Sequence, residues 1–119
     1  MDCTIYNVTN FIGKRWTLLI ILEIYKGDKD WKRYSDIKKG IVSITPKLLS
    51  QRLKELEHEK IILKKTDSSS VPIRTEYSLT ESGKDFVKVI QDMKKWAIKH
   101  KPHARICENT DCKGCVLGL

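Results

Sequence analysis

The pattern of apolar residues predicts a helix that is buried on every side near the start of the chain. Residues 14–26 read KRWTLLIILEIYK, and their apolar positions cover all faces of a helix instead of one stripe. Leucine and glutamate favour a helix over a long strand, and Gly27 provides a stop. Residues 3–11 predict a shorter helix before it. We therefore expect the core to form around residues 14–26.

The clearest amphipathic helix follows at residues 45–60. Thr45 is suited to cap its exposed amides, and Pro46 is suited to the first helical position, where no amide partner is needed. Its apolar face is formed by leucines that step by four and three, namely Leu49, Leu53 and Leu56. Residues 30–39, which lie before it and are mostly charged, predict a short surface helix that ends at Gly40.

Two runs rich in Ile, Thr and Tyr predict a β-hairpin in the second half of the chain. They span residues 61–66 and 72–79, and the polar residues 67–71 form the turn between them. Thr80 then caps a last helix over residues 81–100. The apolar residues of this helix form a stripe that is wider than one seam, which suggests that the helix also packs on a partner. The stripe consists of Phe86, Val89, Ile90, Met93, Trp96 and Ala97.

This order of elements is that of a winged helix-turn-helix. The predicted fold is mainly α with a small β-hairpin wing, an α+β arrangement in one domain over residues 1–100. Residues 101–119 form a separate tail that contains cysteines. In such a fold, one helix buries an apolar face and projects its first turn into the major groove of DNA, which is ~12 Å wide.

The charge of the chain agrees with a polyanionic partner. The 119 residues include 23 basic and 15 acidic ones, so the formal net charge is +8. The excess of positive charge is spread over three segments. Residues 26–40 and residues 41–65 each contain six basic and three acidic residues, and residues 84–105 contain seven basic and two acidic residues. A well-solvated basic surface is the other interpretation of this excess.

The candidate DNA contacts lie in the helix 45–60 and the wing 61–79. Short polar and cationic residues occupy the start of the helix and the face opposite the leucines, with Arg52 at the edge of that face: Ser43, Thr45, Pro46, Lys47, Ser50, Gln51, Arg52 and Lys54. The wing would carry Lys64, Lys65 and Arg74 to the sugar-phosphate backbone or the minor groove. The partner is then double-stranded DNA.

Several short segments together resemble a known family. They are Cys3, Gly13 to Trp16, Tyr34 with Ile37 before Gly40, Ile44 to Glu57, Pro72 to Thr80 with Gly83, and Trp96. In this order they resemble the HxlR-type winged-helix transcriptional regulators, a branch close to the MarR proteins. The resemblance covers residues 3 to about 100. It implies a homodimer, formed by the first and last helices, that regulates a nearby promoter from a pseudo-palindromic operator.

The chain departs from the family at Lys60, where the family usually has a glycine after the reading helix. We expect Lys60 to take the left-handed conformation at some energetic cost. The homodimer that the resemblance implies, together with the wide stripe of the last helix, assigns five residues to the dimer interface: Ile5, Val8, Val89, Met93 and Trp96.

The cysteines allow several interpretations. Some relatives use an N-terminal cysteine such as Cys3 as a thiol switch, whereas the neighbouring Asp2 disfavours the reactive thiolate and suggests an inert or partly buried side chain. In the tail, Cys107, Cys112 and Cys115 have a spacing that suits a metal ion or an iron–sulfur cluster, with His103, His100 or Cys3 as a fourth ligand. A reversible disulfide and inert thiols are the alternatives. No other cofactor is indicated.

The remaining features concern compartment and function class. There is no signal peptide, and the apolar run from Trp16 to Tyr25 is shorter than the ~18 residues of a membrane span, so we expect a cytoplasmic protein. We find no phosphate loop, nucleophile elbow or convergent His/Asp/Glu set, and an enzyme is not expected. The alternative function is a winged-helix module that binds another protein without specific DNA binding.

Overall fold

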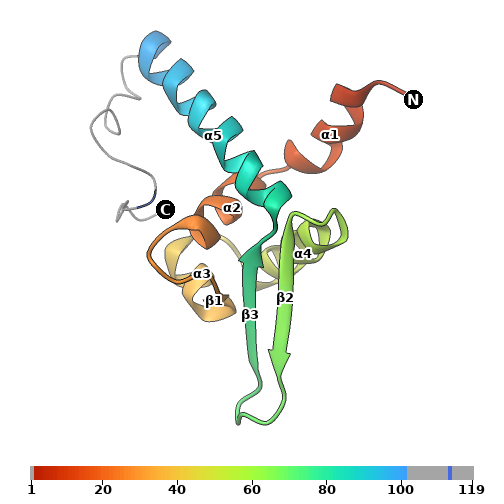
Figure 1. Cartoon of the computed structure of the whole chain (residues 1–119), viewed down its shortest axis with the longest axis vertical. Coiled ribbons are helices and arrows are strands. Elements are labelled where there is room, and N and C mark those ends of the chain that lie inside the picture. The colour runs from red at the N-terminus through yellow and green to blue at the C-terminus, as the bar shows by residue number, and fades with distance from the viewer. Residues whose placement is uncertain (1, 102–112, 114–119) are drawn as a thin grey trace.

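The computed structural model describes residues 2–101 and Lys113 as five helices and a three-stranded sheet. The elements are α1 (Thr4–Ile12), α2 (Thr17–Tyr25), β1 (Lys32–Arg33), α3 (Tyr34–Gly40), α4 (Pro46–His58), β2 (Ile62–Asp67), β3 (Arg74–Leu79) and α5 (Glu81–His100). The strands are antiparallel in the order β1-β3-β2. Figure 1 shows the β2–β3 hairpin, which we call the wing, projecting away from the end of the molecule where α1 and α5 extend. This is the winged helix-turn-helix expected from the sequence.

The predicted helix at residues 14–26 is shorter in the structure, and its start differs. Its first residues are not helical, because Trp16 has a positive φ of 80° and α2 begins at Thr17. At the other end, Gly27 follows α2 with a φ of 77°, a conformation that favours glycine. The third helix ends at Gly40, as predicted. A Cβ atom there would first meet the carboxylate at the end of the Glu23 side chain, so a larger residue at position 40 would require that side chain to move.

Strand β1 was not predicted. Its two residues pair with β3, with Lys32 opposite Tyr77 and Arg33 opposite Glu76. Two residues are too few to show an alternating pattern, and the expected helix over residues 30–39 begins only at Tyr34 as a result. Pairing with β3 fixes the start of α3 against the base of the wing.

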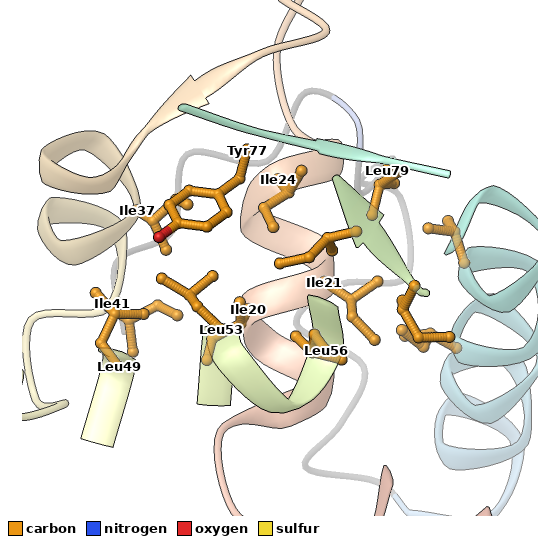
Figure 2. Packing of buried hydrophobic residues seen from close by; sticks show 14 of the residues in the cluster. Ile20, Ile21, Ile24, Ile37, Ile41, Leu49, Leu53, Leu56, Tyr77 and Leu79 are labelled. Carbon is orange, nitrogen blue, oxygen red and sulfur yellow. The ribbon is translucent and has the colours of Figure 1, made fainter. Parts of the chain in front are cut away.

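Helix α2 is the centre of the core. Figure 2 shows its residues Ile20, Ile21 and Ile24 surrounded by apolar side chains of other elements. Ile20 and Ile21 have no exposed surface, and the leucines of α4 predicted to form one apolar face are all buried: Leu49, Leu53 and Leu56. Helices α1, α3, α4 and α5 and strand β3 all contact α2. The contact with α2 therefore determines which side of each of these elements faces outward.

Helix α5 has two apolar faces rather than one wide stripe. Val87, which the sequence analysis left out of the stripe, is buried together with Ile90 and Gly83. Val89, Met93 and Trp96 are about half exposed, at 47%, 50% and 58%. Among the residues that the structure describes, these three belong neither to the buried core nor to the partly buried side chains packed against it.

Both ends of α4 are fixed by local hydrogen bonds. At its start, Thr45 Oγ1 accepts a bond from the Leu48 amide (3.2 Å), and Pro46 is the first helical residue, as predicted. At its end, Lys60 has a φ of 61°, the left-handed conformation expected there, and the Ile61 amide donates to the Leu56 carbonyl. The hydroxyl of Thr80 donates to the carbonyl oxygen of Lys60 (2.7 Å), so the cap of α5 also holds the turn after α4.

A group of charged side chains joins the middle of α4 to the connection between α1 and α2. The Arg52 guanidinium donates to the carbonyl oxygen of Arg15 (3.1 Å) and to the Glu55 carboxylate (3.1 Å), which also binds Lys14. We call Lys14, Arg52 and Glu55 the latch. Only 13% of the Arg52 side chain is exposed, so the structure directs this predicted DNA contact inward.

The C-terminal end of α2 accepts hydrogen bonds from two lysines. Lys32 Nζ donates to the carbonyl oxygen of Ile24 (3.0 Å), and Lys113 Nζ donates to that of Tyr25 (2.7 Å). Burial and the charge of Lys113 lower the pKa of Lys32. Cations at this end of a helix oppose the partial negative charge of its free carbonyl groups, and here they also attach β1 to α2.

The latch makes stability depend on pH through Glu55. Partial burial acts to raise the pKa of Glu55, but hydrogen bonds from Lys14 and Arg52 outweigh it and hold the pKa below its usual value. A lowered pKa contributes stability that is present above the unfolded pKa of about 4.3 and is lost as the pH falls through the folded pKa. We expect Glu55→Gln to lower the free energy of unfolding by about 1 kcal/mol at pH 7, and the deficit to shrink toward pH 3.

Urea denaturation at several pH values measures this deficit. Glu59→Gln is the matched control, because Glu59 is exposed just after the same helix and makes none of the latch contacts. A deficit for Glu55→Gln that is independent of pH would contradict the assigned role of its charge.

Candidate nucleic-acid interface

A hollow of about 550 Å³ lies between α4 and the wing. Its lining comes from the end of β1, the start of α3, the exposed face of α4 and the strands and turn of the wing. It consists of Arg33, Tyr34, Ser35, Ser50, Lys54, Lys64, Pro72, Ile73, Arg74, Thr75 and Tyr77. Four of these residues carry a positive charge, none carries a negative charge, and five carry a hydroxyl group. Such a surface suits the phosphate groups and sugars of a nucleic-acid backbone.

The first turns of α4 project polar side chains beside this hollow. Lys47, Ser50, Gln51 and Lys54 are all exposed, on the side of the helix away from its buried leucines. Ser43, Thr45 and Pro46 are exposed at the start of the helix. Except for the inward-facing Arg52, the residues predicted to contact DNA from this segment therefore lie on one accessible surface.

Tyr34 connects α3 to the start of α4. Its hydroxyl donates to the carbonyl oxygen of Pro46 (3.2 Å) and accepts a bond from Ser50 Oγ (3.4 Å). These contacts of Tyr34 were not predicted, because hydrophobic periodicity gives no information about the phenol oxygen. Arg33, Ser35 and Thr75 were also missed as lining residues, because β1 was not predicted and nothing local brings the start of α3 to the wing.

The two predicted lysines of the wing lie on opposite faces of the sheet. Lys64 is paired with Tyr77 and lines the hollow, whereas Lys65 is paired with Glu76 and its Nζ lies 4.3 Å from the centroid of the Trp31 ring. Arg74 is exposed near the tip of the wing and also lines the hollow. The register places Arg74 on the face of Lys65, two residues from Glu76, yet both Lys64 and Arg74 line the hollow and Lys65 does not.

The tip of the wing is folded by the carboxylate of Asp67. It accepts hydrogen bonds from the hydroxyl and the amide of Ser69 (2.5 and 3.0 Å) and from the hydroxyl of Ser70 (3.0 Å). These bonds hold the pKa of Asp67 below its usual value. Arg74 lies opposite Asp67 in the strand register. The Asp67 carboxylate near this arginine accepts its hydrogen bonds from the serines of the turn.

The residues predicted for the dimer interface lie at the other end of the molecule. Ile5 of α1 is 70% exposed, Val8 is half-buried, and the exposed side of α5 carries Val89, Met93 and Trp96. Figure 1 shows α1 and α5 extending from the same end, opposite the tip of the wing. We call this set of five residues the apolar face.

Cys3 is exposed and caps α1. Its Sγ accepts a hydrogen bond from the amide of Tyr6 (3.4 Å). The thiol is not partly buried, and whether it is inert or reactive stays a prediction. Cys107, Cys112 and Cys115 lie outside the described residues, so the metal, cluster and disulfide hypotheses for them stay predictions. Over residues 2–101 and Lys113, no group of His, Cys, Asp and Glu side chains is arranged to hold a metal ion. Among the same residues, no helix is long and apolar enough to cross a membrane.

Comparison with known proteins agrees with this architecture. The family model for HxlR-like helix-turn-helix proteins matches residues 11–105. The HTH-type transcriptional regulator YvaP of Bacillus subtilis is 35% identical over 88 residues, which are 74% of this chain and 78% of YvaP. The regulator YodB of the same organism is 36% identical over 100 residues, 83% and 86% of the two chains.

Two solved structures have the same fold. The reduced form of YodB superposes with a TM-score of 0.68 at 34% identity and covers 93% of this chain and all of that one. A MarR-family regulator from Porphyromonas gingivalis gives a TM-score of 0.73 at 32% identity, over 83% and 93% of the chains. These relatives are regulators and not enzymes. The chain belongs to the HxlR-like helix-turn-helix family of transcriptional regulators.

Proposed function

We propose that this regulator is a cytoplasmic homodimer that binds a pseudo-palindromic DNA operator in a sequence-specific manner. One observation carries the proposal: four cations from β1, α4 and the wing line one hollow beside the exposed first turns of α4. These cations are separated by up to 41 positions in the sequence, from Arg33 to Arg74. Their convergence without an acidic residue is what a phosphate backbone requires.

In this proposal α4 enters the major groove. Lys47 and Gln51 point from its first two turns with no partner that would hold them to the protein surface in the hydrogen bonds described for residues 2–101, and both side chains suit base edges. The positive end of the helix dipole, at Thr45 and Pro46, favours phosphate.

Lys54, Lys64 and Arg74 would contact the backbone that runs between α4 and the wing. Arg52 stays in the latch and Lys65 stays over Trp31.

The apolar face supports the homodimer. Three half-exposed apolar residues follow one side of α5, and Ile5 of α1 is exposed at the same end of the molecule. A two-fold axis at this end would leave both copies of α4 and of the wing accessible. The two operator half-sites are then expected to lie about one helical turn, ~34 Å, or a multiple of it apart.

A protein-binding module without DNA specificity is the alternative function. Such a module would be favoured by bulky apolar or acidic residues on the exposed face of α4. That face instead carries Lys47, Ser50, Gln51 and Lys54. The apolar surface lies at the opposite end, on α5, where it suits a second copy of the chain.

We also propose that Cys3 responds to oxidants. Its thiol is exposed at the start of α1, next to the apolar face. For YodB, solved structures describe a reduced form, a diamide-treated form and a quinone-bound form. Joining Cys3 to a second thiol would change the group that caps the Tyr6 amide and would place a covalent constraint on α1.

The proposal predicts how DNA binding responds to substitutions in α4. Lys47→Ala and Gln51→Ala should each weaken binding to a site selected from random DNA by about 1–3 kcal/mol if they contact bases. Lys88→Ala, an exposed lysine of α5, is the matched control and should keep full affinity. If two α4 helices and two wings neutralise ~8 phosphates, log K should fall with log salt with a slope near −7. Unchanged affinity of the Lys47/Gln51 double variant would refute the role of α4.

The apolar face predicts a charge-sensitive dimer. Met93→Lys should shift the sedimentation coefficient from dimer to monomer while the helical circular dichroism is retained, because a buried unpaired ammonium opposes association. Asp92→Lys adds a larger change of charge one residue away and should leave the dimer intact, since Asp92 is exposed and pairs only weakly with Lys95 (3.9 Å). Equal behaviour of the two variants would argue against this interface.

The thiol proposal predicts a response to diamide, which oxidises two thiols to a disulfide and is reduced to its hydrazine. Treated wild-type protein should lose Cys3 alkylation, as measured by mass spectrometry, and should change its affinity for the selected DNA. Cys3→Ser should keep its affinity under the same treatment. A variant with serine at Cys107, Cys112 and Cys115 separates the tail from Cys3: if only this variant becomes insensitive, the sensor lies in the tail and the assignment to Cys3 is wrong.

A further inference from the structure

The hydroxyl of Tyr34 contacts two successive turns of α4. It lies 3.2 Å from the carbonyl oxygen of Pro46 and 3.4 Å from Ser50 Oγ, four positions later on the same face of the helix. Tyr34 is the first residue of α3 and follows β1, which pairs with β3. The position of the phenol oxygen is therefore set by the sheet and by α3, outside the helix that it contacts.

The direction of these two hydrogen bonds follows from a count of protons. The carbonyl oxygen of Pro46 can only accept, and the Tyr34 hydroxyl has one proton, so that proton goes to Pro46. Ser50 must then donate its own proton to the Tyr34 oxygen. This leaves Ser50 with only lone pairs toward the hollow that it lines.

A hydroxyl that can only accept discriminates among DNA groups. Phosphate oxygens carry no proton, so they cannot donate a bond to Ser50. In the major groove the donors are the N6 amino group of adenine and the N4 amino group of cytosine. Thymine and guanine present acceptors at the equivalent positions, which would leave two lone pairs facing each other.

We propose that Tyr34 is a positioning residue that fixes the first turn of α4 and restricts Ser50 to accepting a hydrogen bond from an adenine or cytosine amino group. The inference rests on the proposed sequence-specific DNA binding. Tyr34 itself needs no contact with DNA, because it acts through Pro46 and Ser50. Replacement by phenylalanine keeps the ring in the hollow and removes only the hydroxyl.

The test uses the full chain and a randomised duplex library. Sites are selected with the unmodified protein, and affinities for the selected duplex, for its single-base variants and for random duplex are then measured for Tyr34→Phe, Ser50→Ala and the double variant. We expect Tyr34→Phe to bind the selected duplex about five-fold more weakly and to lose the preference for adenine or cytosine at one position in each half-site. Ser50→Ala should lose the same preference, and the double variant should show no additional loss there.

The controls separate this role from a general effect on folding. Tyr25→Phe makes the same chemical change at the end of α2, outside the hollow, and should keep the affinity and base preference of the unmodified chain. Affinity for random duplex should be unchanged in Tyr34→Phe. If Tyr34→Phe melts at a lower temperature, Ser50→Ala decides the question, since it removes only an exposed hydroxyl.

Two results would overturn the inference. If Ser50→Ala or a stably folded Tyr34→Phe keeps the full base preference, the hydroxyl pair has no part in specificity, while the proposed DNA binding stands. If the unmodified chain selects no sequence from the library, the proposed specific binding and this inference fail together.

Discussion

The burial of α2, with four of its nine residues buried and the other five partly buried, is the constraint on which the arrangement of the molecule depends. Its nine residues contain seven apolar side chains, and Ile20 and Ile21 have no exposed surface. Burying them removes enough apolar area from water to organise a domain of this size, and it requires cover from α1, α3, α4, α5 and β3. Because α4 and α5 cover different sides of the same helix, their outer faces point in different directions. The cationic surface and the apolar face therefore lie at opposite ends.

Burial alone would leave α4 free to rotate or slide against α2, because leucine contacts are not directional. Directional contacts remove this freedom at three places. Thr45 and Tyr34 fix the first turn, the latch of Lys14, Arg52 and Glu55 fixes the middle, and the left-handed Lys60 with the Thr80 hydroxyl fixes the end. Each hydrogen bond adds only about 1 kcal/mol to stability. Their main effect is to hold the outer face of α4 in one orientation relative to the wing.

The sequence predicted the parts of the fold that have local signals. Thr45 with Pro46, and Thr80 before a long amphipathic run, are capping signals within a few residues, and α4 and α5 begin where they indicate. Strand β1 exists only because β3 pairs with it, so two residues such as Lys32 and Arg33 could not show it. The inward direction of Arg52 depends on the Arg15 carbonyl, which comes from a loop 37 positions earlier. Such contacts between distant segments decide which polar residues of a site stay free, and no periodicity encodes them.

The cations and the hydroxyl groups of the hollow contribute to binding in different ways. Arg33, Lys54, Lys64 and Arg74 have long, exposed side chains, and their attraction for phosphate does not depend on the base sequence and is screened by salt. Base sequence is distinguished by hydrogen bonds to base edges, and a group whose position is fixed before DNA arrives adapts less readily to a wrong base. Tyr34 and Thr45 hold the first turn of α4 through hydrogen bonds between their hydroxyl groups and its backbone. In the proposed complex, the lysines and arginines of the hollow would supply affinity, and the neutral residues that hold α4 in place would orient the groups that read bases.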